Sequence, residues 1–390
     1  WDLLVRTLHI NGYNTEWVMN ITDVGHLVSD ADDGEDKLEK GARREGKTAW
    51  EVAEFYATDF LREMNELNIV TPTHITKATE HIQEQIELVQ KLEAKGHTYV
   101  IDDGVYFDTA TFPAYSAFAQ LDLEEQQAGA RVEFNTQKRN ATDFALWKFS
   151  PKDTQRDMEW ESPWGVGFPG WHIECSAMSM KYLGDTLDIH TGGIDHIPVH
   201  HTNEIAQSEA VTGKPFANYW LHSNHVLIEG EKISKSLGNG IRLQDIAAKG
   251  ISLEAFRLHV LESQYRSQSK FSWESLQAAT NRLQAYRAMA AQQWQPRTLG
   301  TVTVDIIQAA QAEIQAALAN DLDTPNALAA LSQLESTIAG GGIDVSTQTA
   351  LKSFLVWLDK ALGLKLADTP EITSELKARI TAREHARTNK

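Results

Sequence analysis

The chain has 390 residues, 42% of them apolar, and a formal net charge of −18. This length allows two or three domains at roughly 100–200 residues each, and the composition is that of globular cores, which excludes a disordered chain. The acidic balance counts against bulk binding of nucleic acid, although a local basic face is compatible with it.

Membrane and disulfide classes are also excluded by simple counts. No run approaches the roughly 18 apolar residues that span a bilayer, and the start has no signal-peptide pattern. Cys175 is the one cysteine, so no internal disulfide can form, which fits a reducing compartment. We therefore expect no membrane partner and a cytoplasmic location, with Cys175 either a packed thiol or a ligand.

Both ends of the sequence have helical character. The chain opens on WDLLVRTLHINGY, which is typical of the rear half of an amphipathic helix ending at Gly12. It stops in KARITAREHARTNK, a basic helical pattern without a terminator, and it lacks an initiator Met. We expect a fragment cut at both ends.

The first half predicts short strands and longer helices. The expected strand, two amphipathic helices and β-hairpin cover residues 15–21, 48–67, 79–95 and 99–108. In the hairpin, Asp103-Gly104 is expected to supply the positive φ angles of a tight turn. Residues 109–165 lack long periodicity and predict an inserted module.

The second half alternates before it becomes helical. A helix, a strand, a helix and a strand-like run are expected at residues 172–183, 186–190, 200–213 and 218–230. This alternation predicts an α/β fold with a doubly wound, Rossmann-like core. Beyond residue 245 the pattern is almost wholly helical, with a linker at residues 292–300.

Three residues have the side chains of a metal site. His200 and Glu204 are four residues apart on an expected helix, so they share one face. Together with Cys175 they offer imidazole, carboxylate and thiolate, all ligands of zinc, whose tetrahedral site needs four groups. The alternative is an ordinary His–Glu surface pair beside a buried thiol.

Two further segments fit a nucleotide. Gly192, Gly193 and Asp195 follow a strand, where glycines admit a flat ligand and a carboxylate accepts hydrogen bonds from ribose. Lys232 and Lys235, in KISKS, form a basic loop that can close on polyphosphate. A plain turn and a solvated lysine loop are the respective alternatives.

In this order along the chain, these segments resemble the cysteinyl-tRNA synthetases, a family of class I aminoacyl-tRNA synthetases. The matching strings are NITDVGH (20–26), GWHIECSAM (170–178), DIHTGGIDH (188–196), VHHTNEIAQS (199–208), KISKSLGN (232–239), SQYRSQ (263–268) and DLDTPNAL (321–328). The ordered set carries the resemblance, since no single motif is decisive.

The resemblance implies three regions. They are a catalytic domain at 1–245 with an insertion at about 97–165, a stem-contact helical region at 246–298, and a helical anticodon-binding-type domain at 299–390. Candidate phosphate contacts in the second region are Arg257, Arg266 and Lys270. The basic tail, favoured as solvated helix over a base reader, holds Lys377, Arg379, Arg383 and Arg387.

The resemblance also implies one zinc ion per chain, held by Cys175, His200 and Glu204, with His201 a substitute for His200. The family's other cysteine ligand would lie ahead of Trp1. Zinc would select the thiol of L-cysteine, because an apolar pocket rejects a hydroxyl isostere by only roughly 10². Trp171 and Thr22 would line the amino-acid pocket.

The implied reaction is the ATP-dependent activation of L-cysteine and its transfer to the 3′ end of tRNA(Cys), by a monomer and with Mg²⁺ accompanying ATP. Lys232 and Lys235 would neutralise the phosphates in the transition state. The residues bordering ATP would be His190, Gly192, Gly193, Asp195 and Lys235.

Two departures from the family pattern are visible. The family's His-Ile-Gly-His motif is absent, so we expect the 390 residues alone to be inactive. Thr191 and His196 stand where glycine and leucine are commoner. Two alternatives stay open: a cysteine ligase of the mycothiol pathway, which uses an amino sugar as acceptor, and a non-catalytic truncated paralogue.

Overall fold

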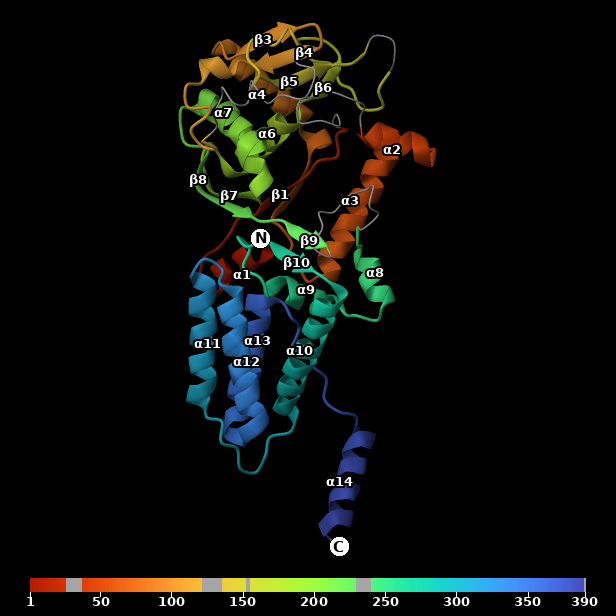
Figure 1. Ribbon diagram of the computed structural model, residues 1–390, viewed down its shortest axis with the longest axis vertical. Helices are drawn as coiled ribbons and strands as arrows, with labels where there is room; N and C mark the ends of the chain where they lie inside the picture. Colours follow the sequence, from red (N-terminus) through yellow and green to blue (C-terminus); the bar gives the residue numbers. More distant parts are fainter. Residues whose placement is uncertain (26–36, 121–134, 152–154, 229–239, 389–390) are drawn as a thin grey trace. The chain divides into compact units, whose positions relative to one another are not determined.

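A computed structural model describes residues 1–25, 37–120, 135–151, 155–228 and 240–388 (Figure 1). The chain forms two compact units. We call residues 16–64 and 71–225 the sheet unit, and residues 1–15, 65–70 and 226–390 the helical unit. None of the described helices combines the length and the apolar character needed to cross a membrane.

The sheet unit contains most of the strands. Its helices are α2 (Lys37–Glu45), α3 (Ala49–Glu66, which ends in the helical unit), α4 (Ile82–Ala94), α6 (Trp171–Leu183) and α7 (Thr202–Thr212). Its strands are β1 (Val18–Ile21), β2 (His74–Lys77), β3 (Thr98–Ile101), β4 (Gly104–Phe107), β5 (Phe144–Phe149), β6 (Gly167–Pro169), β7 (Leu187–Gly193) and β8 (Ala217–Ser223).

Two strand pairs of the sheet unit are parallel: β7–β8 lies where the sequence predicts alternation of strand and helix, whereas β1 pairs with a strand, β2, that the sequence analysis did not predict. In the described chain these are two separate hydrogen-bonded pairs, not one continuous sheet. The crossover from β7 to β8 contains α7, as a parallel connection requires.

The expected hairpin is present, but its turn was predicted wrongly. β3 and β4 pair antiparallel with Ile101 opposite Gly104, so Asp102 and Asp103 form the turn. Neither is among the positive-φ residues of the described chain. A Cβ on Gly104 would lie 2.4 Å from the carbonyl oxygen of Trp147. Close approach of β5, and not turn geometry, therefore requires this glycine.

The antiparallel sheet supports the helices that carry the candidate ligands. Its strand order is β3-β4-β5-β6. One apolar core joins Leu92 of α4, Val105 and Leu146 of the sheet, Ile173 of α6 and Ala206 of α7, and all five are fully buried. α6 and α7 are thereby held on a common base (Figure 1).

α3 confirms the helix expected at 48–67, but its apolar spacing overstates the buried face. Val52 and Met64 are buried. Phe55, Tyr56 and Phe60 are 54%, 52% and 44% exposed. The helical period places these rings beside the buried stripe, and period alone does not say how wide that stripe is.

The helical unit confirms the helical pattern beyond residue 245. Its helices are α1 (Asp2–Ile10), α8 (Leu243–Ala248), α9 (Leu253–Leu261), α10 (Trp273–Ala291), α11 (Val304–Ala319), α12 (Thr324–Gly341), α13 (Val345–Leu362) and α14 (Ser374–Thr388). Its strands, β9 (Val226–Ile228) and β10 (Ser269–Phe271), pair in parallel. The run at 218–230, predicted as one strand, is split between β8 and β9 in different units.

A buried charge cluster fixes α1 inside the helical unit. Asp2, Arg6 and Arg257 are all less than 10% exposed. Asp2 accepts from Arg6 Nε at 2.9 Å and from the Arg257 guanidinium. Arg6 also donates to the carbonyl of Asp359 at 3.0 Å, and Arg257 to that of Leu362 at 2.6 Å. The cluster joins α1 and α9 to α13.

This arrangement corrects one prediction. Arg257 was expected to contact phosphate, but its buried guanidinium is used by Asp2 and by carbonyl oxygens. Arg266 is exposed and pairs with Asp321 at 3.0 Å, and Lys270 is exposed. For these two residues, contact with phosphate stays a prediction.

We expect Asp2→Asn to destabilise the helical unit by about 3–5 kcal/mol, because it leaves two buried guanidinium groups without their anion. Burial alone would raise the pKa of Asp2, but Arg257 and Arg6 lower it overall. The contribution of Asp2 is therefore present above its ordinary pKa of 3.8 and is lost as pH falls below that value. Urea unfolding at pH 7 and pH 3 measures both effects.

The control is Asp59→Asn, which removes a half-exposed partner of Arg62 on α3. A surface pair of this kind contributes about 0–1 kcal/mol. Equal losses of stability in the two variants would contradict the proposed importance of the buried cluster.

Candidate functional site

The candidate ligands come from two helices and the turn before the second. α6 begins after Gly170, where a Cβ would lie 2.1 Å from the carbonyl oxygen of Ala145 in β5. The start of α6 is therefore pressed against the sheet, and Cys175 lies in its second turn. His200 lies in a π-helical turn, Ile197–His201, and Glu204 in the first turn of α7.

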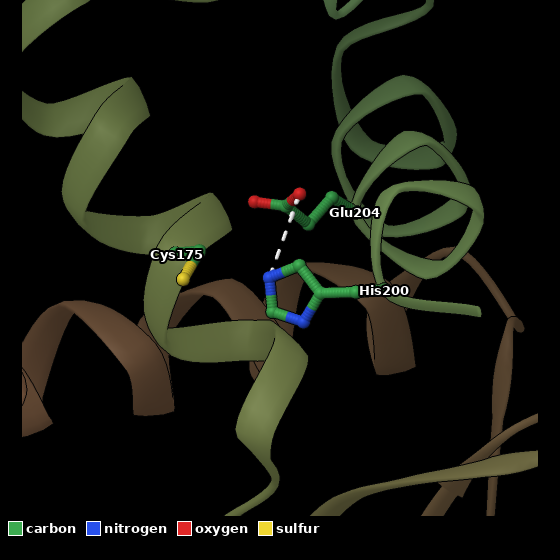
Figure 2. A group of neighbouring side chains, drawn as sticks. All are labelled: Cys175, His200 and Glu204. Carbon is green, nitrogen blue, oxygen red and sulfur yellow. Dashed lines mark ion pairs between the residues drawn. The ribbon is translucent and has the colours of Figure 1, made fainter. Parts of the chain in front are cut away.

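Cys175, His200 and Glu204 converge (Figure 2). One ligand atom from each lies within 4.8 Å of the others. His200 Nε2 is 3.7 Å from Glu204 Oε2. Glu204 is 0% exposed and His200 6%. The three residue types that the sequence predicts as ligands are therefore within reach of one ion.

The charge states of this group suit a cation. Burial, the neighbouring Glu204 and then Glu174 raise the pKa of the Cys175 thiol. Burial lowers the pKa of His200 well below its ordinary value and outweighs the opposing effect of Glu204. Burial would raise the pKa of Glu204, but His190 and His200 lower it overall. The site thus holds a neutral imidazole, an anionic carboxylate and a thiol that a cation would help to ionise.

Glu204 also has an unmet oxygen. Its Oε1 atom is buried and has no hydrogen-bond partner among the described residues. A buried carboxylate oxygen without a donor is costly unless a cation or water meets it. Together with the thiol and imidazole, this orphaned atom shows that the residues present fit a zinc ion.

A second set of donors shares Glu204. His190 Nε2 lies 3.0 Å from Glu204 Oε2, and His201 Nε2 lies 3.9 Å from the same oxygen. Burial, followed by His190 and His222, lowers the pKa of His201 to about 2. His201 Nδ1 and His222 Nε2 are 2.8 Å apart. His190, predicted to border adenosine, is thus in direct contact with a candidate metal ligand.

Sequence reasoning missed the residues that support the ligands. His172 Nδ1 lies 3.0 Å from His200 Nδ1, and Ser176 donates to Gln207 Oε1 at 2.7 Å, which ties α6 to α7. His172 is three residues before Cys175, a helical spacing that could have indicated a shared face. A hydrogen bond at one ring nitrogen fixes which nitrogen of His200 is free for a metal.

Of the two predicted pocket residues, one contacts a candidate ligand and the other is linked to one through Asn20. The Trp171 ring is 4.6 Å from the His200 ring. Asn20, which the sequence did not single out, donates to Thr22 Oγ1 at 3.1 Å and to Cys175 Sγ at 3.6 Å. Trp171 therefore contacts a candidate ligand, whereas Thr22 is linked to Cys175 only through Asn20.

The structure describes some of the residues that the sequence predicts to contact the nucleotide. Gly192 and Gly193 end β7, and Asp195 follows in a short 3₁₀ turn. A Cβ on Gly192 would lie 2.6 Å from a ring atom of His201 and 2.8 Å from a ring atom of His196. The two histidine rings therefore explain why a glycine is needed at position 192 without invoking a ligand. Lys232 and Lys235 lie outside the described residues.

His196, one of the departures from the family pattern, belongs to the same group of rings. Its ring lies 5.0 Å from that of His200 and 5.2 Å from that of His201. The departure therefore adds an imidazole next to the candidate ligands. Thr191 is paired with Leu221 in the β7–β8 ladder.

We expect Gly192→Ala to displace the imidazoles of His201 and His196, with a loss of stability of about 1–3 kcal/mol from overpacking. The change should appear in the absence of any nucleotide. Thermal unfolding and the histidine proton NMR spectrum measure it.

The matched control is Gly41→Ala in α2, where a new Cβ meets nothing within 4 Å. Alanine is the better helix former by about 1 kcal/mol, so this variant should be slightly stabilised. An unchanged histidine spectrum in Gly192→Ala would refute the steric explanation.

Comparison with known proteins gives a consistent result. The family described as "tRNA synthetases class I (C) catalytic domain" matches residues 1–281. A cysteine–tRNA ligase of Treponema denticola is 44% identical over 386 residues, which are 94% of this chain and 77% of that protein. Cysteine–tRNA ligase 1 of Burkholderia lata is 46% identical over 394 residues, covering 100% of this chain and 81% of that protein.

Solved structures support the fold class. Methionyl-tRNA synthetase of Mycobacterium tuberculosis, bound by methionyl-adenylate, superposes with a TM-score of 0.64 over 94% of this chain and 88% of that one, at 14% identity. The α/β fold class predicted from the sequence is confirmed. The resemblance carried by the ordered motifs is confirmed as well: the chain belongs to the class I tRNA synthetases of the cysteine type, a family of aminoacyl-tRNA ligases.

Proposed function

We propose that this chain activates L-cysteine with ATP and transfers it to the 3′ end of tRNA(Cys), with one zinc ion held by Cys175, His200 and Glu204. The convergence of these three side chains carries the proposal, and the unpartnered Oε1 atom of Glu204 supports it. Family membership supports the ligase chemistry, and relatives named cysteine–tRNA ligase support the choice of amino acid and tRNA.

Zinc would provide a soft cation that binds the substrate thiolate and discriminates against the hydroxyl of serine. The chain's own residues prepare the pocket for it. Glu204 supplies fixed negative charge, and His200 stays neutral and free to ligate. The Trp171 ring packs on His200, and Asn20 donates toward the Cys175 sulfur, so the ligands are oriented from two sides.

In the reaction, the carboxylate of cysteine attacks the α-phosphate of ATP and pyrophosphate leaves. The 3′ hydroxyl of tRNA then attacks the adenylate carbonyl, and AMP leaves. Lys232 and Lys235 would stabilise the phosphate charge, with Mg²⁺ on ATP. Gly192, Gly193, Asp195 and Lys235 would border ATP, and His190, which holds Glu204, would lie between nucleotide and metal.

The proposal extends to the remaining regions. Residues 1–245 would form the catalytic domain, with an insertion at about 97–165. Residues 246–298 would serve the acceptor stem, with exposed Arg266 and Lys270 as phosphate contacts, and residues 299–390 the anticodon side. The basic tail is exposed at Arg379, which pairs with Glu375, as expected of a solvated helix. A monomeric state and a cytoplasmic location stay predictions.

The zinc site is tested by metal analysis of the protein expressed from its complete coding sequence. We expect about one zinc per chain, lost in Cys175→Ala and in His200→Asn. His97→Asn is the control, because His97 lies in the same unit and bonds Thr111, away from the ligand group. Absence of zinc from the unsubstituted protein, or its retention in both ligand variants, would refute this site.

The acceptor is tested separately. We expect cysteine-dependent exchange of pyrophosphate into ATP, followed by charging of tRNA(Cys). Charging of an amino sugar in place of tRNA would favour the mycothiol-type ligase, and the absence of both would favour a non-catalytic paralogue. The same exchange assay on the printed 390 residues tests the expectation that they are inactive alone.

A further inference from the structure

The inserted segment reaches the back of the helix that carries Glu204. Tyr115, which follows the β3–β4 hairpin, donates from its hydroxyl to Asn203 Oδ1 at 2.7 Å across 88 residues of sequence. Tyr115 is 7% exposed and Asn203 1%. Asn203 immediately precedes Glu204 in the first turn of α7. The hydroxyl of Tyr115 therefore binds the side chain of the residue that immediately precedes a candidate ligand.

This contact lies two residues beyond an irregular turn of the backbone. His200 lies in the π-helical turn Ile197–His201, and α7 begins directly after it. Thr202 caps the junction by donating to the carbonyl of Ile197 at 2.7 Å. Such wide turns are rare and are not sustained by helix geometry alone. The relative placement of His200 and Glu204 therefore depends on contacts from outside the helix.

Tyr115 also reaches His200 by a second route. Its ring stacks on Phe144 with centroids 6.4 Å apart, and Phe144 meets His172 edge to face at 5.7 Å. His172 in turn lies 3.0 Å from His200 through their Nδ1 atoms. Tyr115 is thus linked to Glu204 through Asn203 and to His200 through Phe144 and His172.

We propose that Tyr115 is a positioning residue for the zinc site: by anchoring Asn203 and packing behind Phe144, it sets the spacing of Glu204 and His200 and so the affinity for metal and cysteine. The inference rests on the function proposed above. It gives the inserted segment a part in substrate selection through residues that do not touch the substrate.

The hydroxyl group is the part to remove. Without it, Asn203 Oδ1 loses its buried donor, and the first turn of α7 is free to shift toward another one. Loss of an outer-shell partner at a metal site commonly lowers metal affinity about 10–100-fold. Tyr115→Phe keeps the ring stacked on Phe144 and removes the 2.7 Å bond to Asn203, together with the longer contact of 3.5 Å between the hydroxyl and the Thr142 carbonyl.

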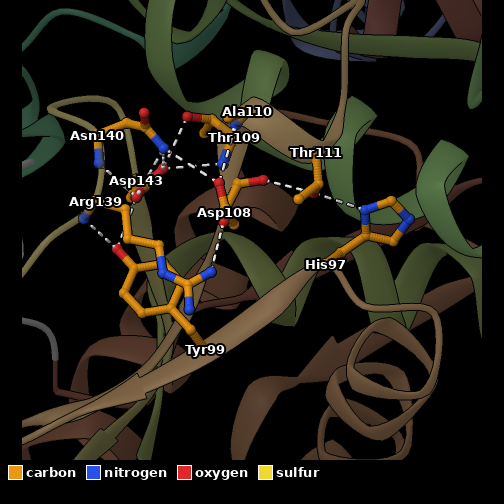
Figure 3. Close-up of polar contacts among 9 residues, drawn as sticks. All are labelled: His97, Tyr99, Asp108, Thr109, Ala110, Thr111, Arg139, Asn140 and Asp143. Carbon is orange, nitrogen blue, oxygen red and sulfur yellow. Dashed lines mark hydrogen bonds and ion pairs between the residues drawn. The ribbon is translucent and has the colours of Figure 1, made fainter.

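The matched control is Tyr99→Phe in the same inserted module. Tyr99 is 8% exposed, its hydroxyl donates to Asp143 at 2.7 Å, and it accepts from the amide of Arg139 at 3.0 Å (Figure 3). Figure 3 shows this bond inside a network of Asp108, Thr109 and Asn140, which all belong to the inserted module. The control removes the same buried atom from a bond that does not involve α6 or α7.

The experiment measures zinc affinity by competition with a chromophoric chelator, the KM for cysteine, and amide exchange of residues 202–212 in metal-free protein. For Tyr115→Phe we expect zinc binding at least tenfold weaker, a raised KM for cysteine and faster exchange in α7. For Tyr99→Phe we expect zinc affinity within twofold of the unsubstituted protein.

A double variant keeps the test sharp. If Tyr115 acts through Asn203, then Asn203→Ala combined with Tyr115→Phe should weaken zinc binding no more than the stronger single change. Unchanged zinc affinity in Tyr115→Phe, or equal losses in Tyr99→Phe, would overturn the positioning role alone. A parent protein without zinc would instead overturn the proposed function on which the inference rests.

Discussion

The burial of the Glu204 carboxylate is the constraint around which the sheet unit is arranged. An anion with no exposed surface and one unmet oxygen is tolerable only beside groups that favour its charge. His190 and His200 face it, and both helices that approach it are tied together by Ser176 and Gln207. The antiparallel sheet holds these helices through a shared apolar core, so much of the unit serves to keep one charge in place.

The helical unit also buries a carboxylate, that of Asp2, but here no buried side-chain oxygen of the carboxylate lacks a partner among the described residues. Asp2 is buried with two arginines, whose remaining donors bond carbonyl oxygens at the C-terminal end of α13 and those of Leu67 and Asn68. Protein atoms satisfy the charges of that cluster, which is expected of a group with a structural role. In the Glu204 group one carboxylate oxygen lacks a partner among the described residues, which is expected of a binding site. The fully partnered carboxylate of Asp2 is thus suited to holding helices together, and the incompletely partnered carboxylate of Glu204 is suited to binding a ligand.

Local patterns in the sequence predicted what depends on local spacing. Helical period placed α3, α4, α6 and α7, and the i, i+4 rule paired His200 with Glu204. The same rules failed where tertiary contacts decide. The Asp-Gly pair at 103–104 suggested a turn, yet Gly104 serves strand β5. Arg257 carries a charge suited to phosphate but is buried in an ion pair with Asp2. Tyr115 and Asn203 are 88 residues apart, and no periodicity could have joined them.

The π turn at Ile197–His201 makes the number of residues in this segment important for the site. Each residue of an α-helix advances the chain by about 100° around its axis, so deleting one residue here would rotate everything beyond it by that amount relative to what precedes. A helix would still form, its composition would hardly change, and its apolar residues could still pack. The Glu204 side chain would nonetheless no longer point toward Cys175. Within the family, substitutions in this turn are therefore expected to be tolerated more readily than any change in its number of residues.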